Sequence, residues 1–233
     1  MTDRTEQRNR LRQRLEAKYP DLQLTDTQLN NYLDAQDRMQ GQPTKGRAEV
    51  GRVEMRRAGP ESAEDILDFF DNRAFANNPG WASCYCIYHH LGQDAEPRWE
   101  DRSWQDNRDE LRTRIESGSM RAFLAYEGNQ VVGWCNASDR GEFPEHATGD
   151  DEGVASLVCF TVAPTHRGYG IGAQLLDAAM SELPSDGVEL AEAYPVPDHV
   201  EDASAYHGRV KLFKKAGFVE SEDAQSEKVQ RRF

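Results

Sequence analysis

The chain has 233 residues, 37% of them hydrophobic, which is enough for one full domain with an appendage but not for two large domains. Its 41 acidic residues outnumber its 28 basic residues, and the net charge of -13 disfavours polyanionic partners, so we expect no nucleic-acid binding. No apolar stretch approaches the length of a membrane span, and the first residues lack the apolar region of a secretory signal, so we expect a cytoplasmic protein without a membrane partner.

Residues 1–51 are expected to form a helical extension and a linker. Two early segments carry apolar side chains at helical spacing, one around Leu11 and one around Leu29, but both stripes are thin. The stretch QGQPTKGRAEVG at 40–51 contains Gly, Pro and charged residues without periodicity, which is typical of a linker. We therefore predict a main domain over 52–233 and a separate helical appendage. We expect the appendage to lie at a subunit contact of a homodimer.

The main domain opens with a strand and a helix. Residues 52–58 alternate like a strand, and the following SAEDILDFF has Ser62 as a cap, early acids and an apolar stripe. Residues 73–96 mix turn formers, aromatic residues and two cysteines, which predicts little regular structure. A polar helix is then expected from about 97 to 117, and Gly118 ends it.

Two antiparallel strands and one buried strand follow. The segment RAFLAYEGNQVVGWCNAS has two apolar runs around Gly128 and Asn129, which predicts a hairpin. The acidic loop 139–153 leads into ASLVCFTVAP, a nearly continuous apolar run that favours a strand buried on both faces. We take this run as the central strand of the domain.

A glycine-rich turn comes directly after the central strand. The stretch THRGYGIGAQLL at 165–176 places three glycines within five positions, before a helix with one apolar side. Backbone N–H groups at the start of such a helix are unpaired, and glycine lets a phosphate approach without a Cβ in the way. The pattern predicts a pyrophosphate site, and a tight turn without a ligand is the alternative.

Two common phosphate-binding motifs do not fit this turn. A P-loop needs Gly-Lys followed by Ser or Thr, and no such triplet follows the glycines. Gly168, Gly170 and Ala173 satisfy the dinucleotide pattern G-x-G-x-x-A, with Glu192 at about the expected distance downstream. However, roughly 60 residues remain after the turn, too few for the rest of a doubly wound sheet. We therefore reject both motifs.

A third pattern, R-x-x-G-x-G, is met by Arg167, Gly170 and Gly172. It follows a strand that ends in FTVAP, and the later segment LFKKAGF at 212–218 echoes the pattern LY-x-K-x-GF. With this order and spacing, the chain resembles the GNAT superfamily of acyl-CoA-dependent N-acyltransferases. The resemblance covers about residues 52–233.

The resemblance implies an α/β fold of the α+β type, with a mixed, mostly antiparallel central sheet flanked by helices. Strands at 156–162 and 188–194 would splay apart, and acetyl-CoA would enter between them as a co-substrate, with no metal. The backbone N–H near Val162 would polarise the thioester carbonyl, and the glycine turn would hold the pyrophosphate. The implied cofactor-binding residues are Phe160, Thr161, Val162, Arg167, Gly168, Tyr169, Gly170, Ile171, Gly172, Ala173 and Phe213.

The general base has several candidates. Glu192, in VELAEAYP, could take the proton from the amine directly or through water. The alternative for Glu192 is a solvated carboxylate at a strand end. His146 and Glu145 in the acidic loop are further candidates, although loop carboxylates usually face water.

The general acid must differ from the tyrosine that many GNAT sequences carry in LY-x-K-x-GF. That position is Phe213 here, which has no proton to give. Tyr206 is our candidate acid, because it lies on the same face if 206–216 is one helix, and a bend at Gly208 would bring it closer. The alternative is that Tyr206 only packs on the sheet, and Tyr85 is then the reserve candidate.

The cysteine segment, residues 73–96, is the candidate acceptor site. Some GNAT sequences carry a similar GW-x-x-CYC segment, and aromatic and thiol side chains suit a flat or apolar acceptor. The implied substrate-binding residues are Trp81, Cys84, Tyr85 and Cys86. Zinc ligation by Cys84 and Cys86 with His89 and His90 is disfavoured because zinc sites usually use C-x-x-C. A loop packed on the core is the alternative, and Cys135 and Cys159 are expected to be reduced core residues.

Together these features predict an N-acetyltransferase that transfers the acetyl group of acetyl-CoA directly to a primary amine in a ternary complex. The partner is expected to be a small-molecule amine. Two alternatives remain: an enzyme that acetylates protein or peptide amines with help from the N-terminal helices, and a non-catalytic acyl-CoA-binding regulatory module.

Overall fold

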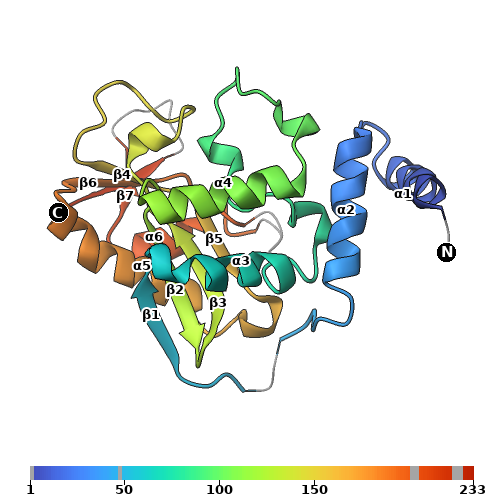
Figure 1. Ribbon diagram of the computed structural model, residues 1–233. Coiled ribbons are helices and arrows are strands. Elements are labelled where there is room, and N and C mark those ends of the chain that lie inside the picture. Colours follow the sequence, from blue (N-terminus) through green and yellow to red (C-terminus); the bar gives the residue numbers. More distant parts are fainter. Residues whose placement is uncertain (1–2, 47–48, 200–204, 222–227) are drawn as a thin grey trace.

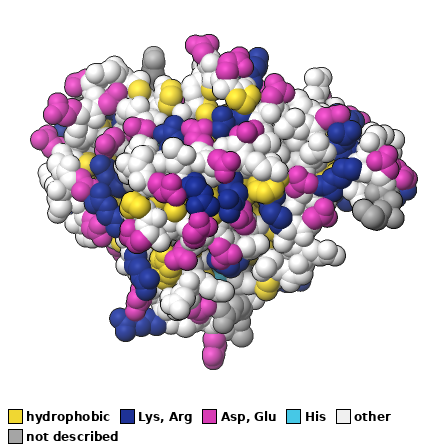
Figure 2. Space-filling model, in the orientation of Figure 1, with side chains coloured by type: hydrophobic (Ala, Val, Ile, Leu, Met, Phe, Trp, Pro, Cys, Tyr) yellow, Lys and Arg dark blue, Asp and Glu magenta, His cyan; other side chains and the backbone are white. Residues whose placement is uncertain are grey.

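The computed structural model describes residues 3–46, 49–199, 205–221 and 228–233, in which helices surround two four-stranded sheets (Figure 1). The helices are α1 Arg4–Lys18, α2 Asp26–Arg38, α3 Ala63–Asn72, α4 Trp104–Ser117, α5 Ile171–Glu182 and α6 Val210–Lys215. The strands are β1 Val53–Arg57, β2 Ala122–Glu127, β3 Gln130–Asn136, β4 Val154–Leu157, β5 Cys159–Val162, β6 Leu190–Ala193, β7 Val219–Glu220 and β8 Val229–Arg232. None of the helices in these ranges combines the length and the apolar composition of a membrane span. Acidic and basic side chains are interspersed over the face in Figure 2.

One stretch of chain belongs to both sheets. The first sheet has the order β1-β2-β3-β5 and is antiparallel, and the second has the order β4-β6-β8-β7, with β4 and β6 parallel. The predicted mixed, mostly antiparallel architecture flanked by helices is confirmed. The expected single central strand is instead divided into β4 and β5 at Val158, because its first half pairs with β6 and its second half with β3.

Glycine turns explain where the predicted elements agree with the structure and where one helix differs from it. The predicted hairpin joins β2 to β3 at Gly128, whose φ is 60°, and the predicted polar helix ends at Gly118, whose φ is 74°. The helix expected over 206–216 begins only at Val210. Gly208, with a φ of 78°, turns the chain before the helix, so Tyr206 lies in a turn and not on α6.

Alternation along β2 builds two hydrophobic clusters, one on each face of the first sheet. Leu124 belongs to the cluster with α3 and α4, and Phe123 to the cluster with α5. Figure 1 shows α3 and α4 side by side across the sheet. On the other face, α5 approaches β3 closely because Gly133 has no side chain: an added Cβ would lie 3.0 Å from Cγ2 of Ile171.

The second helix of the N-terminal extension is docked on the main domain. Leu29 and Ala35 of α2 are fully buried. The side-chain amide of Asn31 donates to the backbone oxygen of Arg102 and accepts from the backbone N–H of Trp104, both at 2.9 Å. In Figure 1, α1 lies beyond α2, away from the sheets. The two large hydrophobic clusters nevertheless draw all their residues from 52–233, so we keep the prediction that this range folds by itself.

A chain that starts at Gly46 is therefore expected to stay folded with a lower free energy of unfolding. The loss should be about 2–5 kcal/mol, because the apolar contacts of α2 and two buried hydrogen bonds disappear. Urea unfolding followed by circular dichroism measures it. In the full chain, Asn31→Ala should cost about 1–3 kcal/mol and the exposed Gln36→Ala much less. An unfolded or insoluble truncated chain would show that α2 is part of the core.

Candidate active site

A cavity of about 360 Å³ opens between the cysteine segment and β5. Its walls include the short turns Pro79–Trp81, Tyr88–His90 and Trp99–Asp101. The described residues that line it are Phe75, Gly80, Trp81, Ser83, Cys84, Cys86, Tyr88, His89, Trp99, Cys159, Thr161 and Tyr206. The set is rich in aromatic rings and thiols and contains no Asp, Glu, Lys or Arg among these described residues.

A strained turn directs two neighbouring side chains of the cysteine segment to different places. Tyr85 and Cys86 have φ values of 47° and 60°, in the left-handed region that residues with a Cβ rarely adopt. The buried Tyr85 donates its hydroxyl to Asp71 at 2.5 Å. Cys86 lines the cavity, and its sulfur accepts from the amide of Asn136 at 3.4 Å. Strain of this kind persists where surrounding contacts hold it, and it concentrates at functional sites.

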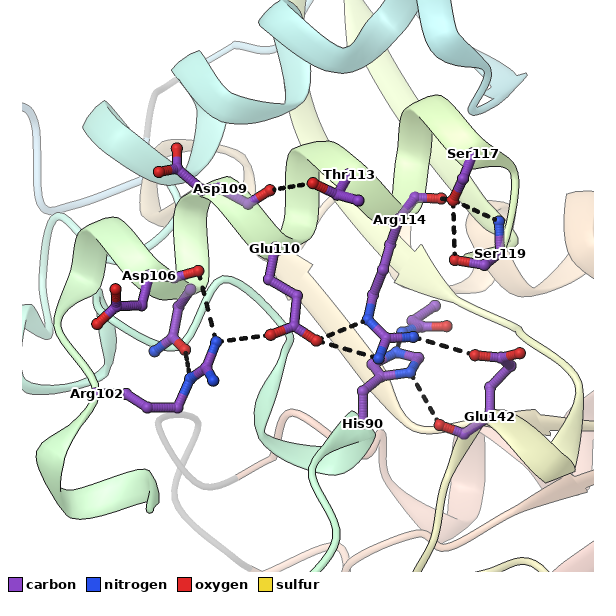
Figure 3. A network of polar contacts seen from close by, with 12 residues as sticks. His90, Arg102, Asp106, Asp109, Glu110, Thr113, Arg114, Ser117, Ser119 and Glu142 are labelled. Atoms are coloured by element: carbon purple, nitrogen blue, oxygen red, sulfur yellow. Dashed lines mark hydrogen bonds and ion pairs between the residues drawn. The ribbon is translucent and has the colours of Figure 1, made fainter. Parts of the chain in front are cut away.

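Helix α4 anchors the turn that carries the paired histidines (Figure 3). Arg102 donates to Glu110 at 2.6 Å, Arg114 contacts Glu110 and Glu142 at 3.1 Å each, and the backbone oxygen of Glu142 lies 3.0 Å from Nδ1 of His90. Burial and the nearby charge of Arg114 lower the pKa of His90 to about 3. His90 is therefore neutral and donates from Nδ1 to Glu142.

Three further histidines meet beside the cavity. The ring of His89, which lines the cavity, lies 4.9 Å from that of His207 and 6.3 Å from that of His146. One ring nitrogen of each is buried with no hydrogen-bond partner among the described residues: Nδ1 of His89 and His207, and Nε2 of His146. Burial lowers the pKa of His89 to about 3 and of His207 to about 4, and it also lowers the pKa of His146. All three rings are neutral at pH 7.

Tyr206 joins the cavity to the edge of the first sheet. Its ring lies 5.0 Å from that of Trp81 and 6.1 Å from that of His89. Its backbone oxygen accepts from the N–H of Phe160 on β5 at 2.6 Å. Burial raises the pKa of the Tyr206 hydroxyl, so the hydroxyl keeps its proton at neutral pH.

The glycine turn after β5 is open. Gly168 and Gly170 have φ values of 87° and 75°, and a Cβ added at either, or at Gly172, would have no other atom within 4 Å. Gly170 is the N-cap of α5, and no side chain caps the helix there. Arg167 donates from Nε to the backbone oxygen of Val162 at 3.0 Å. The turn thus presents backbone N–H groups and a positive helix end to an unobstructed surface, which suits a phosphate group.

Glu192 lies away from the cavity. It is 2% exposed on β6, where its two carboxylate oxygens lie 3.0 Å from Nζ of Lys228 and 3.4 Å from Arg140. Tyr194 also donates to it at 3.4 Å. Because its oxygens are paired with two cations and it does not line the cavity, we do not assign it as the base. His146, another candidate base, stacks on Tyr194 with ring centroids 3.8 Å apart.

The cavity brings together five of the predicted site residues, Trp81, Cys84, Cys86, Thr161 and Tyr206. Two others lie elsewhere. Tyr85 points into the core, because the strained turn rotates it away from the cavity. Phe213 is fully buried against Phe160 and Phe218, so its ring belongs to the core under β5. The cavity residues Phe75 and Trp99 were not predicted, although aromatic residues crowd that part of the sequence.

Two expectations for the cysteines have different outcomes. Cys135 is fully buried, as expected for a small core residue, but Cys159 lines the cavity as well as being buried. All four thiols are free. Over the described ranges, no group of three or more His, Cys, Asp and Glu side chains is arranged to hold a metal ion.

Comparison with known families places this architecture. The model of the acetyltransferase (GNAT) family matches residues 84–218, which is more than half of the chain. The chain belongs to the GNAT acetyltransferase family. The match begins at Cys84 and includes both halves of the divided strand and the glycine turn. Among curated proteins, no significant match was found.

Solved structures of acetyltransferases are similar at low sequence identity. A GNAT family acetyltransferase from Brucella melitensis in complex with acetyl-CoA is 16% identical, with 78% of this chain and 88% of that chain covered and a TM-score of 0.46. The PaiA N-acetyltransferase from Thermoplasma acidophilum in complex with coenzyme A is 16% identical, with coverage of 78% and 100% and a TM-score of 0.47. A probable acetyltransferase from Staphylococcus epidermidis is 13% identical, with coverage of 78% and 99% and a TM-score of 0.48.

The neutral histidines of this GNAT domain predict how its stability depends on pH. The pKa values of His89, His90 and His207 are lowered from 6.5 to about 3, 3 and 4. At pH values between the lowered pKa and 6.5, the unfolded chain therefore binds more protons than the folded chain. The free energy of unfolding should therefore fall as the pH drops from about 6.5 towards 4, by up to about 1.4 kcal/mol per pH unit for each histidine. Urea unfolding at several pH values measures the slope. His207→Asn should reduce it and the exposed His199→Asn should not, and equal slopes would contradict the prediction.

Proposed function

We propose that the protein transfers the acetyl group of acetyl-CoA to a primary amine of a small molecule, by direct transfer in a ternary complex. The observation that carries this proposal is that one short strand, β5, borders both the cavity and the glycine turn. Cys159 and Thr161 on β5 line the cavity. The turn follows Val162 and leads into α5, on the other face of the same sheet. A thioester held along β5 would thus have its acyl group at the cavity and its phosphates at the turn.

The residues at the turn fit the diphosphate of acetyl-CoA. Space is open around Gly168, Gly170 and Gly172, and the start of α5 has no side-chain cap. Arg167 adds a positive charge beside this space. We propose that the backbone of Phe160, Thr161 and Val162 pairs with the pantetheine arm. Because the N–H of Phe160 already donates to Tyr206, the pairing would centre on Val162.

The chemistry needs a neutral amine, a polarised carbonyl and a proton for the departing thiolate. We propose that the backbone N–H of Val162 polarises the thioester carbonyl. Tyr206 is the proposed proton donor, since its hydroxyl remains protonated and it borders both the cavity and β5. Acetyl-CoA supplies the activated acetyl group, and no metal takes part in this scheme.

A peptide amine is the second candidate acceptor. A groove of about 780 Å³ runs between the N-terminal helices and the main domain and shares Gly80, Trp81, Ser83 and Trp99 with the cavity. Arg14 and Lys18 of α1 border this groove. An extended peptide could lie in it with its terminal amine at the cavity. A small molecule is favoured because the cavity itself has the aromatic walls that enclose a compact ligand.

Acetyl-CoA is expected to raise the melting temperature of the protein, because a ligand that binds only the folded state stabilises it. Gly170→Val should abolish this shift by obstructing the phosphates. Gly187→Val is the matched control: Gly187 also has a positive φ (82°) and open space, but it lies at the far end of α5. Gly172→Leu tests the obstruction without left-handed strain. No shift in the wild type at millimolar acetyl-CoA would contradict the proposal.

Tyr206→Phe is expected to lower kcat by about 100-fold or more and to leave the affinity for acetyl-CoA nearly unchanged, because only a transition-state interaction is removed. The phenyl ring would keep the contacts with Trp81 and His89. The assay measures thioester cleavage from the amount of free thiol that is released. A decrease of less than roughly threefold would assign the proton to solvent. Acetyl-CoA binding without any cleavage would favour the regulatory module.

A further inference from the structure

The cavity differs from the rest of the molecule in its charge. Asp, Glu, Lys and Arg make up 30% of the chain, yet none of them is among the described residues that line the cavity. An ammonium group that enters such a cavity loses its water and finds no carboxylate to pair with. The lining therefore favours an acceptor that is uncharged when it binds.

Five of the twelve described residues that line the cavity are Phe, Trp or Tyr. Trp81 packs against Tyr206 with ring centroids 5.0 Å apart, and Tyr88 packs against Trp99 at 5.1 Å. Trp81 and Tyr88 are 37% and 42% exposed, so both line the cavity without being buried. With Phe75 these rings surround a space of about 360 Å³, which suits a single flat ring system.

His89 is the histidine that lines the cavity, and it is more than nine-tenths buried. Its Nδ1 is buried and has no hydrogen-bond partner among the described residues, so Nε2 is the ring nitrogen that a ligand in the cavity can reach. Four ring centroids lie within 6.3 Å of that of His89: those of Tyr88 and Tyr206, which line the cavity, and those of His146 and His207, which do not. Burial and the two neighbouring histidines lower the pKa of His89 to about 3, so at pH 7 it is a neutral and weak proton acceptor.

From these observations we propose that the acceptor is an arylamine, with its amino group directly on an aromatic ring, and that His89 takes the proton from its nitrogen. This inference deepens the proposed function and rests on it. An arylamine is neutral at pH 7, whereas an alkylamine is an ammonium ion that so weak a base could not deprotonate. The nitrogen becomes acidic once it has attacked the carbonyl, and His89 can then accept its proton.

The step is balanced. The amine nitrogen forms a bond to the acetyl carbon, the carbon–sulfur bond breaks, and its electron pair leaves on the sulfur of coenzyme A. His89 receives one proton from the nitrogen, and Tyr206 gives one to the thiolate. The products are the N-acetylarylamine and free coenzyme A, and His89 and Tyr206 return to their starting states through solvent.

The acceptor class is tested with two probes that differ by one methylene group, 4-methoxyaniline and 4-methoxybenzylamine. We expect kcat/KM at pH 7 to be higher for the aniline by about 100-fold or more, because the benzylamine must first lose a proton. The rate of benzylamine acetylation should rise with pH, and the rate of aniline acetylation should not. Spermidine, kanamycin and a tripeptide complete the panel. Equal or faster acetylation of any of these four alternatives would overturn the proposal, and a faster benzylamine would indicate cation–π binding.

The role of His89 is tested by His89→Ala and His89→Asn. Both should lower kcat by about 30-fold or more with little change in KM, and imidazole should restore activity to His89→Ala. The exposed His199→Asn is the control and should behave as the wild type. Loss of activity without rescue by imidazole would overturn the assignment of His89 as the base.

The acetyl-CoA melting shift separates this proposal from the proposed function. If acetyl-CoA stabilises the protein and an alkylamine or peptide is acetylated instead, the arylamine proposal fails and the acetyltransferase proposal stands. If acetyl-CoA causes no shift and no thiol is released, both fail.

Discussion

At Val158 the backbone stops pairing with β6 and begins to pair with β3, and the candidate site depends on this change. A strand has only two edges for hydrogen bonds, so moving β5 into the first sheet leaves its other edge facing away from β3. Two nearby groups reach that edge: the backbone oxygen of Tyr206 accepts from Phe160, and Arg167 donates to Val162. The same change of sheet therefore brings together the turn around Tyr206, the glycine turn and the cavity on one short strand.

Burial sets the protonation states on both sides of the proposed reaction. It lowers the pKa of His89 and raises the pKa of Tyr206, because the charged form of either group loses hydration. The base is thus free of a proton and the acid retains one at neutral pH, in a cavity where the described walls carry no charge. The charged side chains in Figure 2 lie on the outside, where water hydrates them.

The ion pairs of Glu192 with Arg140 and Lys228 lie outside the cavity and have a structural role. Arg140 also pairs with Asp151, so it ties the acidic loop to β6. Removing one member of such a buried set leaves an unpaired charge, which costs several kcal/mol in proteins, typically about 3–5. The network therefore holds the second sheet and its loop in place. A carboxylate near the end of a strand can look like a base in a sequence and still serve structure.

The sequence by itself determined the elements whose signals are local. The hairpin at Gly128, the helix end at Gly118 and the strand, glycine turn and α5 all follow from turn chemistry and short-range periodicity. Tertiary structure decided the rest. Whether an apolar run stays in one sheet depends on strands far away in the chain, so the break at Val158 has no local signal. The same holds for Tyr85, which a strained turn directs to Asp71, and for Glu192, whose partners Arg140 and Lys228 are 52 and 36 residues away. Those contacts arise only when distant segments meet, and they decide which titratable groups face the cavity.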